Sequence, residues 1–209
     1  MKCNKSFYKD IFKYSLPLFI VSVGYLFINE LDTQMLGYFH NDYEVGIYAV
    51  AKQLVLKLPR ITLALSLGIM PIFAKLNSSN KAKMKESFNK LLTANSLIFI
   101  FIIAVVLLFG DWIIKSMYGS AYESSALILK LLMPNLFFTA TSVILSSFLD
   151  YTGNATKRSR NLLFTIALAI ILNFILIPKY GAIGATISVN ISYLPYIILN
   201  WIEVRKILK

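Results

Sequence analysis

Cysteine, histidine and acidic residues are scarce in this sequence. Its 209 residues include one cysteine (Cys3), one histidine (His40) and only 10 Asp and Glu residues. A single cysteine excludes an internal disulfide. His40 has no cysteine or carboxylate neighbour at the spacing of metal ligands, so we expect no metal site there. No metal and no cofactor are therefore predicted.

Charge of either sign is also low. Charged residues make up 15% of the chain, against about a quarter in a soluble domain, while hydrophobic residues make up 57%. The mean hydropathy is +0.68. A soluble core of this size does not need so much apolar surface, so we expect the surplus to face lipid. The even spread of the apolar runs predicts one membrane domain, residues 1–209.

The apolar runs are long enough to cross a bilayer, which takes roughly 20 residues of helix. Six spans are predicted near residues 12–39, 46–76, 88–109, 126–150, 161–177 and 182–204. The expected fold class is all-α, a polytopic membrane protein with a bundle of six transmembrane helices. The first run contains Pro17, Asn29 and Glu30 and lacks the pattern of a cleavable signal peptide.

The positive charges are distributed unevenly between the two sides of the predicted bundle. The net charge of +11 lies in short tracts between apolar runs, which does not indicate a nucleic-acid-binding face. One side holds only Lys115 and Lys179, and the other holds fifteen cations. These are Lys2, Lys5, Lys9, Lys13, Lys75, Lys81, Lys83, Lys85, Lys90, Lys157, Arg158, Arg160, Arg205, Lys206 and Lys209. The positive-inside rule then predicts a multi-pass protein of the inner or plasma membrane with both termini in the cytoplasm.

The second span carries three cations, Lys52, Lys57 and Arg60, before its uninterrupted apolar stretch. A cation at the centre of a membrane helix costs about 2.5–3.5 kcal/mol, so exposure of all three to lipid is unfavourable. At 100° per residue they fall within a sector of roughly 140°, so one wet face can hold them. An alternative is that residues 46–60 lie flat on the membrane while residues 61–76 alone span it.

The first span ends in a group of polar residues that includes acids: Asn29, Glu30, Asp32 and Gln34. If the chain turns around Asp42, Asp32 is level with Lys52, and acid and base can pair across the hairpin. We expect a water-filled cavity here, lined by the cations Lys52, Lys57 and Arg60 and partly balanced by the acids. Such a cavity suits a pyrophosphate-bearing or polyanionic ligand.

Five prolines lie within the predicted spans: Pro17, Pro59, Pro71, Pro134 and Pro195. Each removes a backbone hydrogen bond and bends its helix. In a bilayer the freed carbonyl must be satisfied by other protein groups or by trapped water. A bundle of bent helices is therefore expected.

Three segments resemble a known family. Residues 32–39 (DTQMLGYF), followed by residues 45–48 (VGIY), resemble the hairpin between the seventh and eighth helices of Wzx-type polysaccharide flippases. Residues 152–154 (TGN) with Lys157 are similar to a cytoplasmic turn of that family, and residues 172–185 are close to the stretch joining its last two helices. The resemblance covers nearly the whole chain.

The resemblance implies one lobe, the C-terminal one, of a MATE-like transporter with two six-helix lobes. Family members move an oligosaccharide linked to undecaprenyl pyrophosphate from the cytoplasmic to the outer leaflet by alternating access. Lys52, Lys57 and Arg60 would then hold the pyrophosphate or acidic sugars, and Asp32 occupies the comparable acidic position. The implied partners are lipid-linked oligosaccharide, membrane lipid and a second six-helix lobe, either an N-terminal half or another copy of the chain.

Two other interpretations remain open. The chain can be a truncated remnant with no transport of its own. It can also be a membrane enzyme of polysaccharide assembly, but the sequence shows no H-x-x-x-x-D-like pair and no nucleophile–base arrangement, so we do not expect an enzyme. Within the transporter interpretation, peptidoglycan precursors and drugs are alternative cargoes.

Overall fold

The computed structural model describes residues 5–76 and 81–208, and within these ranges it contains helices and short turns but no strand. The elements are α1 (Lys5–Phe39), α2 (Asp42–Lys57), α3 (Arg60–Leu76), α4 (Lys81–Tyr118), the 3-10 turn η1 (Ser120–Tyr122), α5 (Ser125–Leu131), α6 (Met133–Tyr151) and α7 (Ala155–Leu208). The all-α prediction is confirmed.

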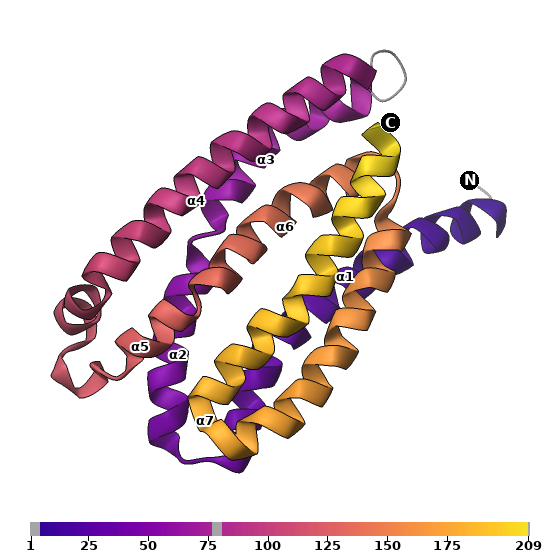
Figure 1. Cartoon of the computed structure of the whole chain (residues 1–209). Coiled ribbons are helices and arrows are strands. Elements are labelled where there is room, and N and C mark those ends of the chain that lie inside the picture. Colours follow the sequence, from indigo (N-terminus) through magenta and orange to yellow (C-terminus); the bar gives the residue numbers. More distant parts are fainter. Residues whose placement is uncertain (1–4, 77–80, 209) are drawn as a thin grey trace.

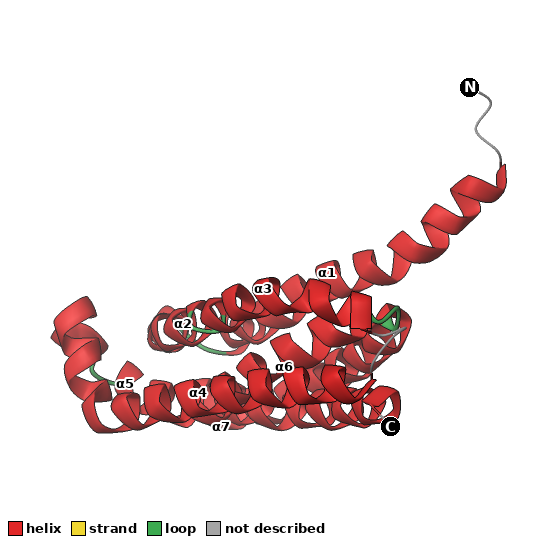
Figure 2. Cartoon of the chain, turned by 90° about the horizontal axis from the view of Figure 1, so that it is seen from above, coloured by secondary structure: helices red, strands yellow, loops and turns green. Residues whose placement is uncertain are grey.

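The helices form two layers, with α1, α2 and α3 in one and α4, α6 and α7 in the other (Figure 2). The N-terminal end of α1 extends away from the other helices (Figures 1 and 2). α7 folds back on itself, so that it consists of two antiparallel arms (Figure 1). The reversal lies at Gly181, whose φ of 54° falls in the left-handed region that favours glycine.

The reversal of α7 is held by the connection between α1 and α2. Glu44 Oε2 accepts the Ala182 N–H at 2.9 Å, and His40 Nε2 donates to the Ile177 carbonyl at 2.7 Å. A Cβ added at Gly181 would lie 2.8 Å from the same Glu44 oxygen. The first and last hairpins of the chain are therefore joined at one end of the bundle, and glycine is required at the contact.

Two helices are interrupted in the middle of predicted spans. α2 ends at Lys57 and α3 begins at Arg60, so Pro59 lies at the break. α5 and α6 meet at a bend of 47°, and Pro134 occupies the first turn of α6. Proline lacks the amide N–H that would continue the helix, which explains why the breaks occur here. The expected bend is thus found at Pro134 and an interruption at Pro59, whereas α7 continues through Pro195 as a regular helix.

By length and composition, α4 and α7 are apolar enough to cross a membrane among the described residues, and the bent pair α5–α6 can form a third span. Large apolar side chains also remain on the surface, such as Phe101 and Leu108 on α4, which are 70% and 75% exposed. The chain is thus a multi-pass membrane protein. Each of the six predicted spans falls within one helix, one arm of α7 or one interrupted pair, and the count of six stays a prediction.

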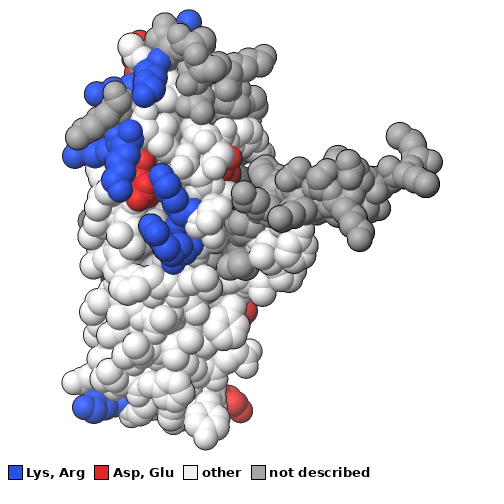
Figure 3. All heavy atoms as spheres, turned by 90° about the vertical axis from the view of Figure 1, so that its right-hand side faces the viewer, with Lys and Arg blue, Asp and Glu red and all other residues white. Residues whose placement is uncertain are grey.

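The charged side chains are segregated along the bundle. Figure 3 shows Lys and Arg gathered in the upper part of one face, above a wide uncharged surface. The upper end is the one where α7 ends in Figure 1. This distribution matches the unequal division of cations read from the sequence, while the orientation of the termini stays a prediction.

The buried apolar residues form three clusters. One contains Phe73, Phe88 and Phe148, whose rings pack at centroid distances of 5.0 Å (Phe88–Phe148) and 5.2 Å (Phe73–Phe148). A larger cluster lies around α2, α5 and the start of α6. The third joins α1 to both arms of α7 and includes Tyr193 and Tyr196. These two tyrosines also line the main cavity, so the core positions the site directly.

Candidate functional site

A buried ion pair joins α1 to α2. Lys52 is 8% exposed and Asp32 is 2% exposed. The Lys52 ammonium donates to Asp32 Oδ1, to the Asn29 carbonyl and, at 2.9 Å, to Thr33 Oγ1. Asp32 also accepts from the Tyr48 hydroxyl and, at 2.7 Å, from the Thr33 N–H. The predicted pairing of Asp32 with Lys52 across the hairpin is confirmed.

Local sequence explains this register. The Asn41 side chain caps α2 by accepting the Glu44 N–H at 3.0 Å, so α2 begins directly after the turn. Tyr48 and Lys52 are one turn apart on α2 and therefore lie on the same face. That face meets Asp32 because the connection between the two helices is only two residues long.

The pair leaves almost no space for a ligand. The adjoining cavity measures about 10 Å³, room for roughly one water molecule, and is bounded by Asn135, Val189 and Tyr193 on the far side. All three ammonium donors of Lys52 already have acceptors. Lys52 is therefore committed to Asp32 and fixes α2 against α1.

A larger cavity lies beside the pair, between α1, the α2–α3 break, α6 and α7. Its volume is about 470 Å³. Most of its lining side chains carry a hydroxyl, amide or charged group. The lining residues are Tyr25, Asn29, Leu56, Pro59, Arg60, Leu63, Thr139, Ser142, Val143, Ser146, Ser147, Asp150, Arg158, Tyr193 and Tyr196. Most of the exposed lining surface is apolar, with polar groups converging on it, which is the usual character of a site for an amphipathic ligand.

Arg158 is held at the cavity wall by a hydrogen-bonded group. Its guanidinium donates to Asp150 Oδ2 and, at 3.3 Å, to the Tyr196 hydroxyl, which lies 3.1 Å from Ser146 Oγ. The turn between α6 and α7 brings Asp150 and Arg158 together, with Gly153 at a φ of 76°. Burial opposes the charge of Arg158, but the neighbouring Tyr196 and Asp150 outweigh it and raise its pKa. Arg158 therefore stays cationic.

The predicted site residues separate into three groups. Asp32 and Lys52 form the buried pair, and Asn29 lies between the pair and the larger cavity, since it lines both spaces. Arg60 lines the larger cavity with Arg158. Lys57, Glu30 and Gln34 are exposed and line neither space.

The three cations of the second span do not share one face. Lys52 and Lys57 both lie on continuous α2, at the two limits of the sector of roughly 140°, so Lys52 is buried against Asp32 while Lys57 is exposed. Arg60 begins α3 after the interruption at Leu58–Pro59 and lines the larger cavity. α2 also packs against α1, α5 and α7 within the bundle, unlike a segment lying flat on a membrane.

Sequence reasoning missed one polar wall of the cavity. Thr139, Ser142, Ser146 and Asp150 follow one another at steps of three or four residues along α6. That spacing places them on one face of a helix, which is a readable signal. In the sequence, Arg158 stands out only as one of the fifteen cations that predict the topology.

The first 127 residues match the family model described as polysaccharide biosynthesis protein. The chain belongs to the polysaccharide biosynthesis protein family. The resemblance to Wzx-type flippases is thereby confirmed, since one curated relative is named a probable glycan biosynthesis flippase and another a putative O-antigen transporter.

Two curated relatives of the chain illustrate the match. The probable low-salt glycan biosynthesis flippase Agl15 of Haloferax volcanii is 25% identical over 186 residues, which cover 88% of this chain and 39% of Agl15. The capsular polysaccharide biosynthesis protein CapF of Staphylococcus aureus is 25% identical over 193 residues, covering 90% of this chain and 48% of CapF. The chain spans less than half the length of these relatives.

A solved structure shares the fold. It is the outward-facing conformation of a multidrug resistance MATE family transporter of the MOP superfamily, with a TM-score of 0.75 and 19% sequence identity. The match covers 94% of this chain and 45% of the transporter. The helical arrangement of the chain is therefore similar to that of part of this transporter.

Proposed function

We propose that the chain is the C-terminal lobe of a two-lobed flippase that moves oligosaccharides linked to a lipid pyrophosphate. The observation that carries this proposal is the cavity of about 470 Å³ that contains Arg60 and Arg158. Membership of the polysaccharide biosynthesis protein family supports a saccharide cargo.

The two arginines suit a pyrophosphate. A guanidinium presents a planar fork of donors that matches two phosphate oxygens. Arg158 is partly neutralised by Asp150, whereas the ion pairs found among the described residues do not include Arg60. Arg60 is therefore the principal anion-binding residue of the proposed site. Arg158 and the neighbouring hydroxyl groups of Tyr196 and Ser146 contact the sugar.

A second lobe is part of the proposal. Alternating access in transporters built from repeats requires two bundles that rock about a site between them. This chain provides the wall of one bundle and aligns with less than half of its relatives. The other lobe is an N-terminal half or a second copy of the chain. In this proposal both termini of the chain lie in the cytoplasm. The lipid carrier is undecaprenyl pyrophosphate.

The test compares two cations that lie three residues apart. The chain in lipid nanodiscs is titrated with farnesyl pyrophosphate and with farnesyl monophosphate, and binding is measured by calorimetry. Arg60→Ala should weaken pyrophosphate binding about 10- to 100-fold, because one charged bidentate contact contributes about 1.5–3 kcal/mol. Lys57→Ala is the matched control and should change binding less than about twofold, because Lys57 is exposed like Arg60 but lies outside the cavity.

Two results would remove support for the proposal. Equal binding by the Arg60→Ala variant and the unaltered chain would show that the cavity does not recognise the phosphates. No binding by the unaltered chain would favour the remnant without transport.

A further inference from the structure

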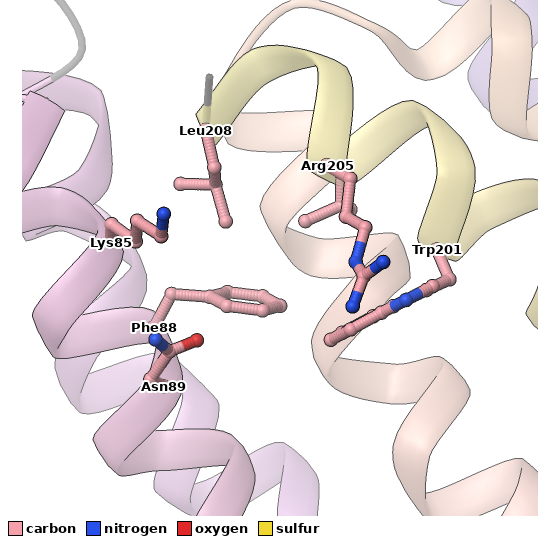
Figure 4. A pocket seen from close by; sticks show the side chains of 7 residues that line it. Lys85, Phe88, Asn89, Trp201, Arg205 and Leu208 are labelled. Atoms are coloured by element: carbon pink, nitrogen blue, oxygen red, sulfur yellow. The ribbon is translucent and has the colours of Figure 1, made fainter.

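A second cavity lies between α4 and the end of α7, away from the proposed cargo site. Its volume is about 300 Å³. Figure 4 shows Lys85 and Asn89 of α4 on one side and Trp201, Arg205 and Leu208 of α7 on the other. The side chains of Lys85 and Arg205 both point into the space between the two helices (Figure 4).

The floor of this cavity is aromatic. Phe88 is fully buried and its ring lies 6.2 Å from that of Trp201. The Arg205 guanidinium lies over the Trp201 ring, 5.1 Å from its centroid. This contact orients the guanidinium without neutralising it, because an aromatic ring carries no net charge.

Both cations of this cavity keep their charge available. Glu203, the acid nearest to Arg205 in sequence, is bound to Lys157 and Lys206 at 3.0 Å each. Glu86 lies next to Lys85 in sequence and is bound to Lys90 at 2.7 Å. The nearby carboxylates are therefore already paired, and the mouth of the cavity is positively charged.

The cavity continues along α4 toward the apolar part of the bundle. Asn89 also borders a shallow groove whose lining begins with the paired Glu86 and Lys90 and continues with Thr93, Ala94 and Leu97. Lys85 and Arg205 lie just outside the predicted spans 88–109 and 182–204, on the side with the excess of cations. Charge thus lies at the membrane surface, and beyond the Glu86–Lys90 pair the groove is uncharged toward membrane depth.

We propose that this cavity binds an anionic phospholipid of the cytoplasmic leaflet. The headgroup phosphate lies between Lys85 and Arg205, and an acyl chain lies against Phe88, Trp201 and the groove beyond Asn89. Basic pockets between membrane helices on the cytoplasmic side are suited to such headgroups. A soluble anion would use the cations but not the apolar track, so the combination selects a lipid. The site is independent of the proposed cargo cavity.

The test uses Trp201 as a reporter. The chain carrying Trp112→Phe has one tryptophan, and its fluorescence is measured in bilayers that contain brominated phosphatidylglycerol or brominated phosphatidylcholine. Phosphatidylglycerol should quench Trp201 at an about 25-fold lower mole fraction than phosphatidylcholine, because two cations each contribute about fivefold. One cation near an anionic surface contributes about a fivefold preference, so Lys85→Ala should lower it about fivefold and Lys85→Ala with Arg205→Ala about 25-fold.

Three controls separate this site from general attraction. Lys81→Ala removes a cation one turn from Lys85 and outside the cavity, and should leave the preference unchanged. Trp201→Phe leaves only Trp112, which lies 69% exposed near the other end of α4, and should show no preference for phosphatidylglycerol. Arg205→Lys keeps the charge and should keep most of the preference, so that a loss in an Arg205→Ala variant reflects the missing charge.

The proposal falls if both lipids quench Trp201 equally, or if Lys81→Ala and Lys85→Ala have equal effects. It also falls if inorganic phosphate or polyglutamate at millimolar concentration displaces phosphatidylglycerol, because the site would then take soluble anions. Loss of quenching selectivity in the Lys85 and Arg205 variants alone supports it.

Discussion

Replacement of Lys52 by methionine tests the buried ion pair most directly. The substitution keeps an unbranched side chain but removes the ammonium and leaves the Asp32 carboxylate, 2% exposed, without its counter-ion. Breaking a buried pair by removal of one partner costs about 3–5 kcal/mol. The Tyr48 hydroxyl and the Thr33 N–H remain as donors to Asp32, so we expect the lower part of that range.

The assay is equilibrium unfolding of the purified chain in mixed detergent micelles, followed by tryptophan fluorescence. Lys52→Met should lower the free energy of unfolding by about 3 kcal/mol. The double variant Asp32→Asn with Lys52→Met removes both charges, and it should recover most of the loss, as expected for coupled residues. Lys90→Met breaks the exposed pair with Glu86 and should cost less than about 1 kcal/mol.

The reasoning is refuted by either of two results. One is a loss below about 1 kcal/mol for Lys52→Met, which is the range of an exposed pair. The other is a double variant less stable than Lys52→Met alone, since the remaining charge would then not be the source of the instability.

Two further predictions concern the turns. Gly181→Ala should destabilise the chain by more than about 1 kcal/mol, because φ is 54° and the new methyl group meets the Glu44 carboxylate. Gly68→Ala, with no atom within 4 Å, should be neutral or stabilising by up to about 1 kcal/mol. The same unfolding assay checks both variants, and equal effects would contradict the role assigned to Gly181. In a chain whose natural cysteine is replaced, a cysteine at Asn41 should react with an impermeant thiol reagent from outside the cell and one at Asn154 only after permeabilisation. Labelling in the reverse order would show that the charge distribution does not set this topology.

Much of the fold follows from the sequence because its signals are local. Apolar runs of helical length between charged tracts are sufficient to locate the helices and their reversals. The Asp32–Lys52 pair could also be derived, because a turn of two residues fixes the register of two regular helices. Helical periodicity then places the two residues at one level.

The composition of the cavity could not be derived in the same way. The break at Leu58–Pro59 separates Lys57 from Arg60. The direction that α3 takes after the break depends on how α3 packs against α6. Arg158 reaches the cavity only because the turn at Gly153 returns it to Asp150. Packing of distant helices decides both cases, and a pattern along one helix does not contain that information.

The two contacts that hold the α1–α2 hairpin form at different times during synthesis. Asp32 and Lys52 are 20 residues apart, so their pair can close once the second helix has left the ribosome. Glu44 and Ala182 are 138 residues apart. At about 5–20 residues per second, roughly 7 to 28 seconds separate the appearance of the two partners. During that interval the buried charges of Asp32 and Lys52 are already paired, while the Glu44 carboxylate still lacks its partner in the final helical arm.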